Sequence, residues 1–485
     1  MNYTKLIGLT CILLALFSAC KTKTSTVASG RNISQQQQSV AFYKDSLYID
    51  SLIGTLPEES EVGISIYNLT TNKSLYTHRN TKLARPASTM KLLTAITTLS
   101  HPDGNKPFTT DVYYSGSINK DTLNGDLYIK GGMDPEFDDA AMDSLVAQVA
   151  KQPFKVLKGH IIGDISMKDS LYWGEGWMWD DAPYEYQPHL SPLLYCKGLV
   201  DITALPDSIK NKAHISVYPN SDYFTIYNRT KSNIAEKSSF EVQRDFVNQS
   251  NIIVASGNVC KKTDQTITVS HGEQYFLHTF TERLRKISNI KITKGYTYTY
   301  NPQIDYSTAT KIASYSTDCE KVVKQMLKAS DNLNAEAMLY RLSAINGNHP
   351  ATASSGVAAI QKKITELGLN SNTYRIVDGS GLSYHDLLTP QLEMAFLKYA
   401  YTHPDLYQII YRCVPISGVD GTLRRRMKNL NIHAKTGSNS LTNTLAGYLT
   451  NKKGEVIAFS IMNQSILDES KAQNFQNAIC TKLCE

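Results

Sequence analysis

Residues 86–99 read PASTMKLLTAITTL and place a serine where a hairpin gives way to a helix. From Met90 onward the apolar side chains recur every three or four residues, which predicts a helix that begins at or near Ser88. Upstream, residues 62–69 alternate apolar and polar side chains, and a Thr-Thr-Asn-Lys turn leads to residues 74–77, which predicts a β-hairpin. The stretch predicts an α/β arrangement with Ser88 at a helix N-terminus.

Ser88 and Lys91 are three residues apart, so on a helix they share a face and the amine reaches the hydroxyl. A serine needs a base to take its proton and a group to stabilise the oxyanion, and the helix N-terminus favours negative charge there. The SxxK spacing alone is weak, because it also occurs at Ser18, Ser117 and Ser288. Only Ser88 opens an apolar-periodic helix directly after a hairpin.

Two later motifs supply the groups that such a serine needs. Lys435-Thr436-Gly437, the single KTG in the chain, ends a predicted strand. A second ammonium near Lys91 would lower the pKa of that base by repulsion, and Lys435 is the candidate. Lys435 and Thr436 suit a substrate carboxylate, and Gly437 allows close approach of the backbone. Ser330 and Asn332 lie in the break between two predicted helices, where they can relay a proton and hold an amide.

Each of these residues, taken alone, is better explained as a turn, a helix cap or a solvated side chain than as a catalytic residue. Their order along the chain, however, is specific. SxxK, SDN and KTG form the motif trio of class A β-lactamases and penicillin-binding proteins. The 242 residues from Ser88 to Ser330 exceed the gap in single-domain members. The chain therefore resembles the class C low-molecular-mass penicillin-binding proteins, the D-Ala-D-Ala carboxypeptidase/endopeptidase family, in which domains are inserted between the first two motifs.

Residues 123–135, 173–181 and 378–383 also match that family. Tyr384-His385-Asp386 departs from it, since the family usually has an Arg and then an Asn there, and the segment after Tyr186 matches only loosely. These departures put side-chain preference in doubt more than the chemistry.

The resemblance implies a role for each motif residue. Ser88 would be the acylated nucleophile and Lys91 its base, while Ser330 and Asn332 would relay a proton and contact the substrate amide. Lys435 and Thr436 would bind the terminal D-Ala carboxylate. The N–H groups of Ser88 and Ser438 would form the oxyanion hole, and Asp181 would bind the stem-peptide amine. Asp181 is otherwise a turn residue beside Trp179.

The first 40 residues predict export and anchoring. Lys5 precedes an apolar run, and Ser18-Ala19-Cys20 follows it, which resembles a bacterial lipoprotein cleavage site with Cys20 lipidated. An ordinary cleaved signal is the alternative. Residues 21–40, rich in Thr, Ser, Gln and Lys, predict a flexible tether. We therefore expect a membrane-anchored protein of the bacterial periplasm.

The remaining chain is expected to form a split catalytic domain. The whole chain has 485 residues, which is more than one hydrophobic core normally supports. Residues 41–110 and 310–485 predict a serine DD-peptidase/β-lactamase-like α/β fold, and 111–309 a large β-rich insertion. The net charge of +6 comes from 50 basic and 44 acidic residues that are interspersed, so no nucleic-acid partner is expected. The sequence has no HExxH, GxGxxG or P-loop, so no metal or organic cofactor is expected. Six cysteines outside the signal leave their pairing open.

The predicted activity is that of a serine D-Ala-D-Ala carboxypeptidase or DD-endopeptidase. It would act on peptidoglycan peptides through an acyl-enzyme on Ser88, and β-lactams would acylate the same serine. Two alternatives remain: a β-lactamase or esterase on the same fold, and a catalytically idle peptidoglycan-binding scaffold. The long insertion argues against the first and the complete motif trio against the second.

Overall fold

The computed structural model describes residues 45–207 and 209–485. Its central sheet has the strand order β18 (Ile432–Asn439), β19 (Thr442–Thr450), β20 (Val456–Gln464), β1 (Glu61–Asn68) and β2 (Lys73–His78). All neighbouring pairs are antiparallel. The N-terminal hairpin thus pairs with strands from the end of the chain, which brings Ser88 and the KTG motif into one sheet region.

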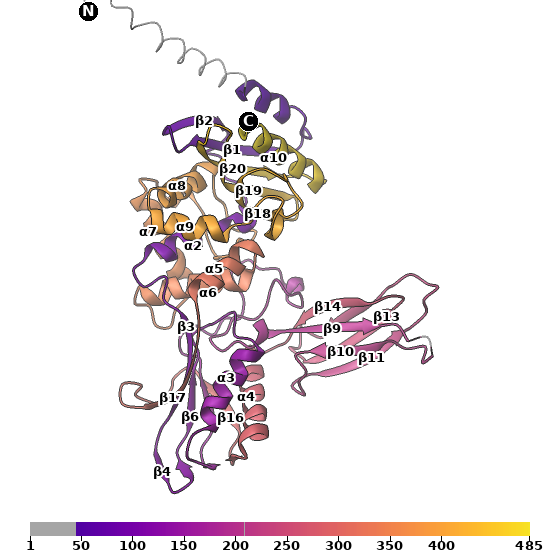
Figure 1. Cartoon of the computed structure of the whole chain (residues 1–485), viewed down its shortest axis with the longest axis vertical. Helices are drawn as coiled ribbons and strands as arrows, with labels where there is room; N and C mark the ends of the chain where they lie inside the picture. The colour runs from indigo at the N-terminus through magenta and orange to yellow at the C-terminus, as the bar shows by residue number, and fades with distance from the viewer. Residues whose placement is uncertain (1–44, 208) are drawn as a thin grey trace, which may run out of the picture. The chain divides into compact units, whose positions relative to one another are not determined.

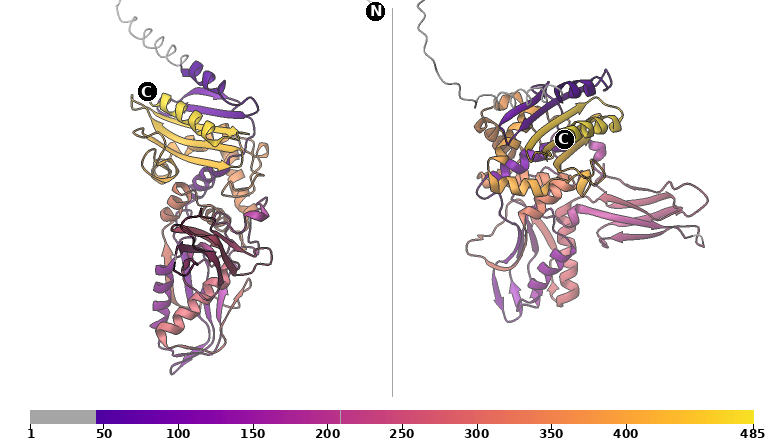
Figure 2. Two further views of the ribbon diagram at one scale, coloured as in Figure 1. Left: turned by 90° about the vertical axis from the view of Figure 1, so that its right-hand side faces the viewer. Right: turned by 45° about the horizontal axis from the view of Figure 1, so that its top comes forward.

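Helices cover both faces of this sheet (Figures 1 and 2). One face carries a helical layer: α2 (Met90–Ser100), α5 (Cys319–Lys328), α6 (Asn332–Ile345), α7 (Ala353–Glu366), α8 (Pro390–Tyr401) and α9 (Pro404–Cys413). Their buried apolar side chains form one cluster with Ala446, Tyr448 and Ala458 of the sheet. On the other face, α10 (Glu469–Leu483) packs Phe475 and Ile479 against the strands.

The chain between α2 and α5 builds a separate core. Its main sheet has the order β16 (Tyr296–Thr299), β8 (Ile161–Asp164), β6 (Leu127–Lys130), β3 (Phe108–Tyr114) and β17 (Thr310–Thr317). Helices α3 (Asp139–Ala150) and α4 (Gly272–Ser288) lie side by side against it (Figure 1). A smaller sheet contains β4 (Ser117–Asn119), β5 (Thr122–Asn124), β7 (Val156–Leu157) and β15 (Lys291–Ile292).

Two three-stranded sheets complete this inserted stretch (Figure 1). One has the order β10 (His214–Tyr218), β9 (Leu199–Leu205), β14 (Thr263–Thr268), and the other β11 (Thr225–Lys231), β13 (Ile252–Asn258), β12 (Glu241–Arg244). The stretch is rich in strands, but α3 and α4 were not expected from its alternating pattern.

Local signals mark several boundaries as expected. Thr389 caps α8 by accepting from the Leu392 N–H at 3.1 Å, and Pro390 is its first residue. Gly368, just past α7, has φ +81°, a conformation that glycine adopts without strain. Helix α9, which begins at Pro404, was not predicted.

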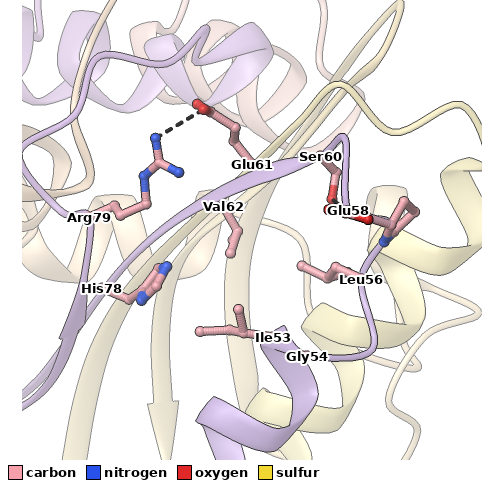
Figure 3. A pocket seen from close by; sticks show the side chains of 10 residues that line it. Ile53, Gly54, Leu56, Glu58, Ser60, Glu61, Val62, His78 and Arg79 are labelled. Atoms are coloured by element: carbon pink, nitrogen blue, oxygen red, sulfur yellow. Dashed lines mark hydrogen bonds and ion pairs between the residues drawn. The ribbon is translucent and has the colours of Figure 1, made fainter.

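The predicted signal, Cys20 and the tether lie outside the described residues. Among the residues that the structure describes, no helix is both long and apolar enough to cross a membrane. A hollow of about 350 Å³ lies beside β1 and β2 (Figure 3). Ile53, Leu56 and Val62 line it, and an Arg79–Glu61 ion pair of 2.9 Å stands at its side. It contains none of the predicted site residues.

Candidate active site

Ser88 lies in a single 3₁₀ turn, η1 (Ala87–Thr89), immediately before α2. Ala87 has φ +45°, a strained left-handed conformation for alanine. The hydroxyls of Thr89 and Thr444 both donate to the Pro86 carbonyl at 2.7 Å, which ties this turn to β19. The turn therefore holds the half-buried Ser88 between the helical layer and the sheet.

Lys91 is fully buried one turn along from Ser88. Its Nζ donates to Ser88 Oγ at 2.8 Å, Asn332 Oδ1 at 2.6 Å and the Ser380 carbonyl at 2.8 Å. All three acceptors of the Lys91 amine are uncharged oxygen atoms. Burial lowers the pKa of Lys91 to about 8, against an opposing pull from the buried carboxyl groups nearby. A lysine in this state can lose its proton near neutral pH, as a general base must.

The SDN motif meets Lys91 from the opposite side. Ser330 has φ +64°, and Asn332 is the first residue of α6, whose N-cap Asp331 accepts from the Asn334 N–H at 3.0 Å. Asn332 accepts from Lys91 through its carbonyl, and its amide nitrogen donates to the Tyr186 carbonyl at 2.9 Å. A sharp turn followed by a capped helix thus fixes both polar side chains.

Lys435 lies within β18 and is also fully buried. Its Nζ donates to Ser330 Oγ at 2.8 Å and to the Thr436 carbonyl at 2.5 Å. Burial, and then repulsion from Lys91, lowers the pKa of Lys435 well below its ordinary value. The electrostatics differ from the sequence argument, because burial, and not repulsion between the two lysines, is the largest cause of the lowered pKa of each.

Gly437 lies where the strand passes closest to the nucleophile. A Cβ there would lie 2.2 Å from Thr444 Oγ1, 2.8 Å from the Pro86 carbonyl and 2.9 Å from the Ser88 nitrogen. Thr436 exchanges a 2.6 Å hydrogen bond with the hydroxyl of Thr422. The next residue, Ser438, is exposed, and its hydroxyl donates to Glu469 at 3.2 Å. Only glycine at 437 lets β18 run this close to Ser88.

Asp181 reaches the site through one aromatic residue. Tyr186 donates its hydroxyl to Asp181 at 2.7 Å, and its carbonyl accepts from Asn332. Trp179, on the same loop, stacks on Phe246 with the ring centroids 5.8 Å apart. The structure therefore brings seven predicted residues together around Ser88 and leaves Asp181 one residue removed.

Three buried carboxyl groups behind Lys91 were not identified from sequence. Glu336 accepts from the Gly379 N–H at 3.1 Å, and Asp378 accepts from Trp177 Nε1 at 3.0 Å and from the Gly381 N–H at 2.7 Å. Burial, and then the nearby Asp378, raises the pKa of Glu336 to about 8. The same causes raise the pKa of Asp386 well above its ordinary value. The only signal in the sequence was that residues 378–383, which include Asp378, match the family, and this match did not indicate a role for the carboxyl group.

The structure also shows the surroundings of Tyr384-His385-Asp386, the segment that departs from the family pattern. Ser440 donates its N–H to the Tyr384 hydroxyl at 3.3 Å, and the Arg85 guanidinium lies 5.0 Å from the centroid of that ring. His385 Nδ1 lies 3.6 Å from a carboxylate oxygen of Glu175. Asp386 is buried beside Asp378 and accepts from the Val377 N–H at 2.8 Å.

A third lysine, Lys197, is partly buried and borders the site from the inserted stretch. Lys197 Nζ contacts Glu136 at 2.7 Å, Asp331 at 2.5 Å and Asn334 Oδ1 at 3.0 Å. Burial works against the charge, but the two carboxylates outweigh it and raise the pKa of Lys197. This cluster holds the inserted stretch against the SDN turn.

The six cysteines of residues 45–485 are free thiols, and four are buried: Cys319, Cys413, Cys480 and Cys484. Within the described chain, no group of three or more His, Cys, Asp or Glu side chains is placed to hold a metal ion. The other SxxK serines of the described residues lie away from the site, with Ser117 in β4 and Ser288 at the end of α4.

Comparisons with known proteins agree with this geometry. A family model described as the D-Ala-D-Ala carboxypeptidase 3 (S13) family matches residues 47–484. The chain is 26% identical over 427 residues to the D-alanyl-D-alanine carboxypeptidase DacB of Haemophilus influenzae, covering 85% of this chain and 87% of that protein. It is 25% identical over 456 residues to the D-alanyl-D-alanine carboxypeptidase of Actinomadura sp. strain R39, covering 90% of this chain and 84% of that protein.

The fold comparison points the same way. The crystal structure of penicillin binding protein 4 from Haemophilus influenzae aligns with a TM-score of 0.78 at 23% identity, covering 90% of this chain and 99% of that chain. The predicted serine DD-peptidase/β-lactamase-like α/β fold is confirmed.

Proposed function

Because the chain belongs to the D-Ala-D-Ala carboxypeptidase 3 family, we propose that it hydrolyses D-alanyl peptide bonds of peptidoglycan stem peptides through an acyl-enzyme on Ser88. The observation that carries this proposal is the position of Lys91. Its fully buried amine lies 2.8 Å from Ser88 Oγ and has a pKa lowered to about 8. A base with this pKa, in contact with the hydroxyl, meets the requirement for a serine nucleophile.

In the proposed reaction, Ser88 Oγ forms a bond to the carbonyl carbon of the penultimate D-alanine while its proton passes to Lys91. The N–H groups of Ser88 and Ser438 stabilise the oxyanion. The C–N bond then breaks, and the leaving amine takes its proton from Lys91, with Ser330, whose hydroxyl accepts from Lys435, as the relay. Water then gives a proton to Lys91 and attacks the ester carbonyl, the ester C–O bond breaks, and Ser88 Oγ takes this proton back from Lys91.

The terminal carboxylate is assigned to the KTG end of the site. Thr436 offers a hydroxyl there, and Lys435 offers a cation held 2.8 Å from Ser330 Oγ. Asn332 forms a hydrogen bond with the substrate amide. Asp181, on the loop that contains Tyr186, binds the amine of the diamino acid. β-Lactams present a similar carbonyl and carboxylate, so they acylate the same serine.

The decisive assay is release of free D-alanine from an N-acylated peptide ending in D-Ala-D-Ala, compared with the Ser88→Ala variant. We expect release by the wild type and none by the variant. An active Ser88→Ala variant would refute the proposed nucleophile. Rapid turnover of penicillin without D-alanine release would favour the β-lactamase alternative, and inactivity toward both compounds would favour the scaffold.

We also propose that the activity lies outside the cytoplasmic membrane, which is supported by the resemblance to bacterial proteins named D-alanyl-D-alanine carboxypeptidases. A lipid anchor at Cys20 is part of the proposal and rests on the export pattern of residues 1–20. Metabolic labelling with a fatty acid should mark the wild type and leave the Cys20→Ala variant unlabelled. Labelling of both would refute the anchor at this position.

A further inference from the structure

A cavity of about 610 Å³ opens beside the KTG end of the site. It is lined by Gln325, Lys328 and Ala329 from the end of α5 and by Gly421, Thr422, Arg424 and Arg425 from the turn η5 (Gly421–Leu423) and the residues after it. We call it the basic cavity. Three of its lining residues are cationic, and the described residues that line it include no acidic side chain.

The basic cavity is joined to the catalytic residues at two points. Ala329 directly precedes Ser330, whose hydroxyl accepts from Lys435. Thr422 shares a 2.6 Å hydrogen bond with Thr436, which is assigned to the substrate carboxylate. A group that extends from the carboxylate end of the substrate therefore meets this cavity next.

The turn that carries the two arginines is built into the structure. Gly421 has φ +57°, and a Cβ there would lie 2.7 Å from the Lys328 carbonyl, so the turn rests directly on the end of α5. Asp420 accepts from the Ile416 N–H at 2.9 Å and pairs with Lys328 at 2.5 Å. These contacts fix the turn without using either arginine.

The charge available for a ligand comes from Arg424 and Arg425. Lys328 is neutralised by Asp420, and the next arginine, Arg426, is committed to Asn477 at 2.9 Å. Arg424 and Arg425 are exposed, and neither makes an ion pair or side-chain hydrogen bond to any residue of the ranges 45–207 and 209–485. Two uncommitted guanidinium groups suit a carboxylate, which they can bind in bidentate fashion.

We propose that the basic cavity binds a second carboxylate, carried by a leaving group larger than D-alanine. In a cross-linked dimer, the scissile D-alanyl bond joins the D-centre of a diamino dicarboxylic acid, and the peptide attached to that residue ends in its own carboxylate. The α-carboxylate at the D-centre occupies the KTG end, and the further carboxylate enters the basic cavity. This inference rests on the proposed function and assigns Arg424 and Arg425 as the residues that recognise the further carboxylate of such a leaving group.

Three substrates test the inference on the full-length chain. The first is an acylated monomer that releases D-alanine, the second is a cross-linked dimer with a free terminal carboxylate on the leaving peptide, and the third is that dimer amidated at this carboxylate. The Arg424→Ala/Arg425→Ala variant is compared with Lys452→Ala/Lys453→Ala, which removes two exposed cations from the β19–β20 turn. Both variants change the net charge equally.

We expect the arginine variant to lose about ten-fold or more in kcat/KM on the free-carboxylate dimer, since hydrogen bonds to charged groups are strong. Cleavage of the monomer, cleavage of the amidated dimer and acylation by penicillin should stay within about two-fold, as should all reactions of the lysine variant. Arg424→Lys/Arg425→Lys should recover part of the loss, because it retains charge without the bidentate geometry.

Unchanged cleavage of the free-carboxylate dimer would overturn the inference, as would an equal loss on the amidated dimer or on the monomer. In these cases the wild type still forms the penicillin adduct and releases D-alanine, so the proposed function stands. A wild type that cleaves none of the three substrates overturns both.

Discussion

Lys91 and Lys197 approach the segment from Ser330 to Asn334 from two sides, and their surroundings give them different chemistry. Lys91 is fully buried against hydroxyl, amide and carbonyl oxygens, and its pKa is lowered to about 8. Lys197 is 21% exposed and pairs with Glu136 and Asp331, which raise its pKa. Burial lowers the pKa of Lys91, whereas at Lys197 the two carboxylates outweigh the effect of burial, so Lys91 suits a base and Lys197 a fixed charge.

The largest effect should follow from removing the base. We expect Lys91→Ala to lower the rate of acylation by penicillin by about 10²- to 10⁴-fold, the range that general-base catalysis contributes. Lys91→Arg should not restore the rate, because a guanidinium stays protonated. Stopped-flow or quenched acylation assays would measure this, with circular dichroism as the control for folding. Near-normal acylation by Lys91→Ala would remove the distinction between the two lysines.

The pH dependence sharpens the same distinction. Below a pKa of about 8 the neutral fraction of Lys91 falls ten-fold per pH unit, so the acylation rate should rise with pH and level off above about pH 8. Lys197→Arg should leave this inflection in place, since Lys197 stays charged throughout. A flat profile from about pH 6 to 9 would mean that Lys91 does not titrate in the reaction.

A smaller effect on rate is expected when the fixed charge is removed. Lys197→Met leaves Glu136 and Asp331 without their cation, and we expect the free energy of unfolding to fall by about 1–3 kcal/mol, because the cluster is partly solvated. Thermal denaturation would measure this, and the acylation rate should fall less than ten-fold. A loss of acylation as large as that of Lys91→Ala, with unchanged stability, would assign Lys197 a direct role in the chemistry.

The smallest effect concerns Asp181, which contacts the site only through Tyr186. We expect Asp181→Asn to lower kcat/KM about three- to ten-fold for peptides with a free amine on the diamino acid, because one charged hydrogen bond is lost. Acetylation of that amine should abolish the difference between variant and wild type. An equal loss on acetylated peptides would show that Asp181 only shapes its loop.

Sequence reasoning succeeded where the signal is local. The cap and proline at Thr389-Pro390, the helix after Ser88 and the three C-terminal strands are encoded by neighbouring residues, and the structure confirms them. The competing SxxK serines could be set aside because only Ser88 opens an apolar helix. Helices α3 and α4 were not predicted, because they lie among short segments whose alternating pattern indicates strands.

The features that escaped prediction depend on long-range contacts. Glu336, Asp378 and Asp386 meet only after α6 packs against the 378–386 loop, so the spacing of these residues says nothing about a shared burial. Likewise, the sequence argument expected repulsion from Lys435 to lower the pKa of Lys91, whereas burial is the largest cause. Burial depends on the whole core and cannot be read from a motif.

The central claim is that Ser88 is the residue that becomes acylated. The most direct test is the intact mass of the full-length chain after treatment with penicillin, followed by peptide mapping of any adduct. We predict one penicilloyl group per chain, located on the peptide that contains Ser88 and missing from Ser88→Ala. An adduct on another serine, or no adduct with the penicillin unconsumed, would contradict the account.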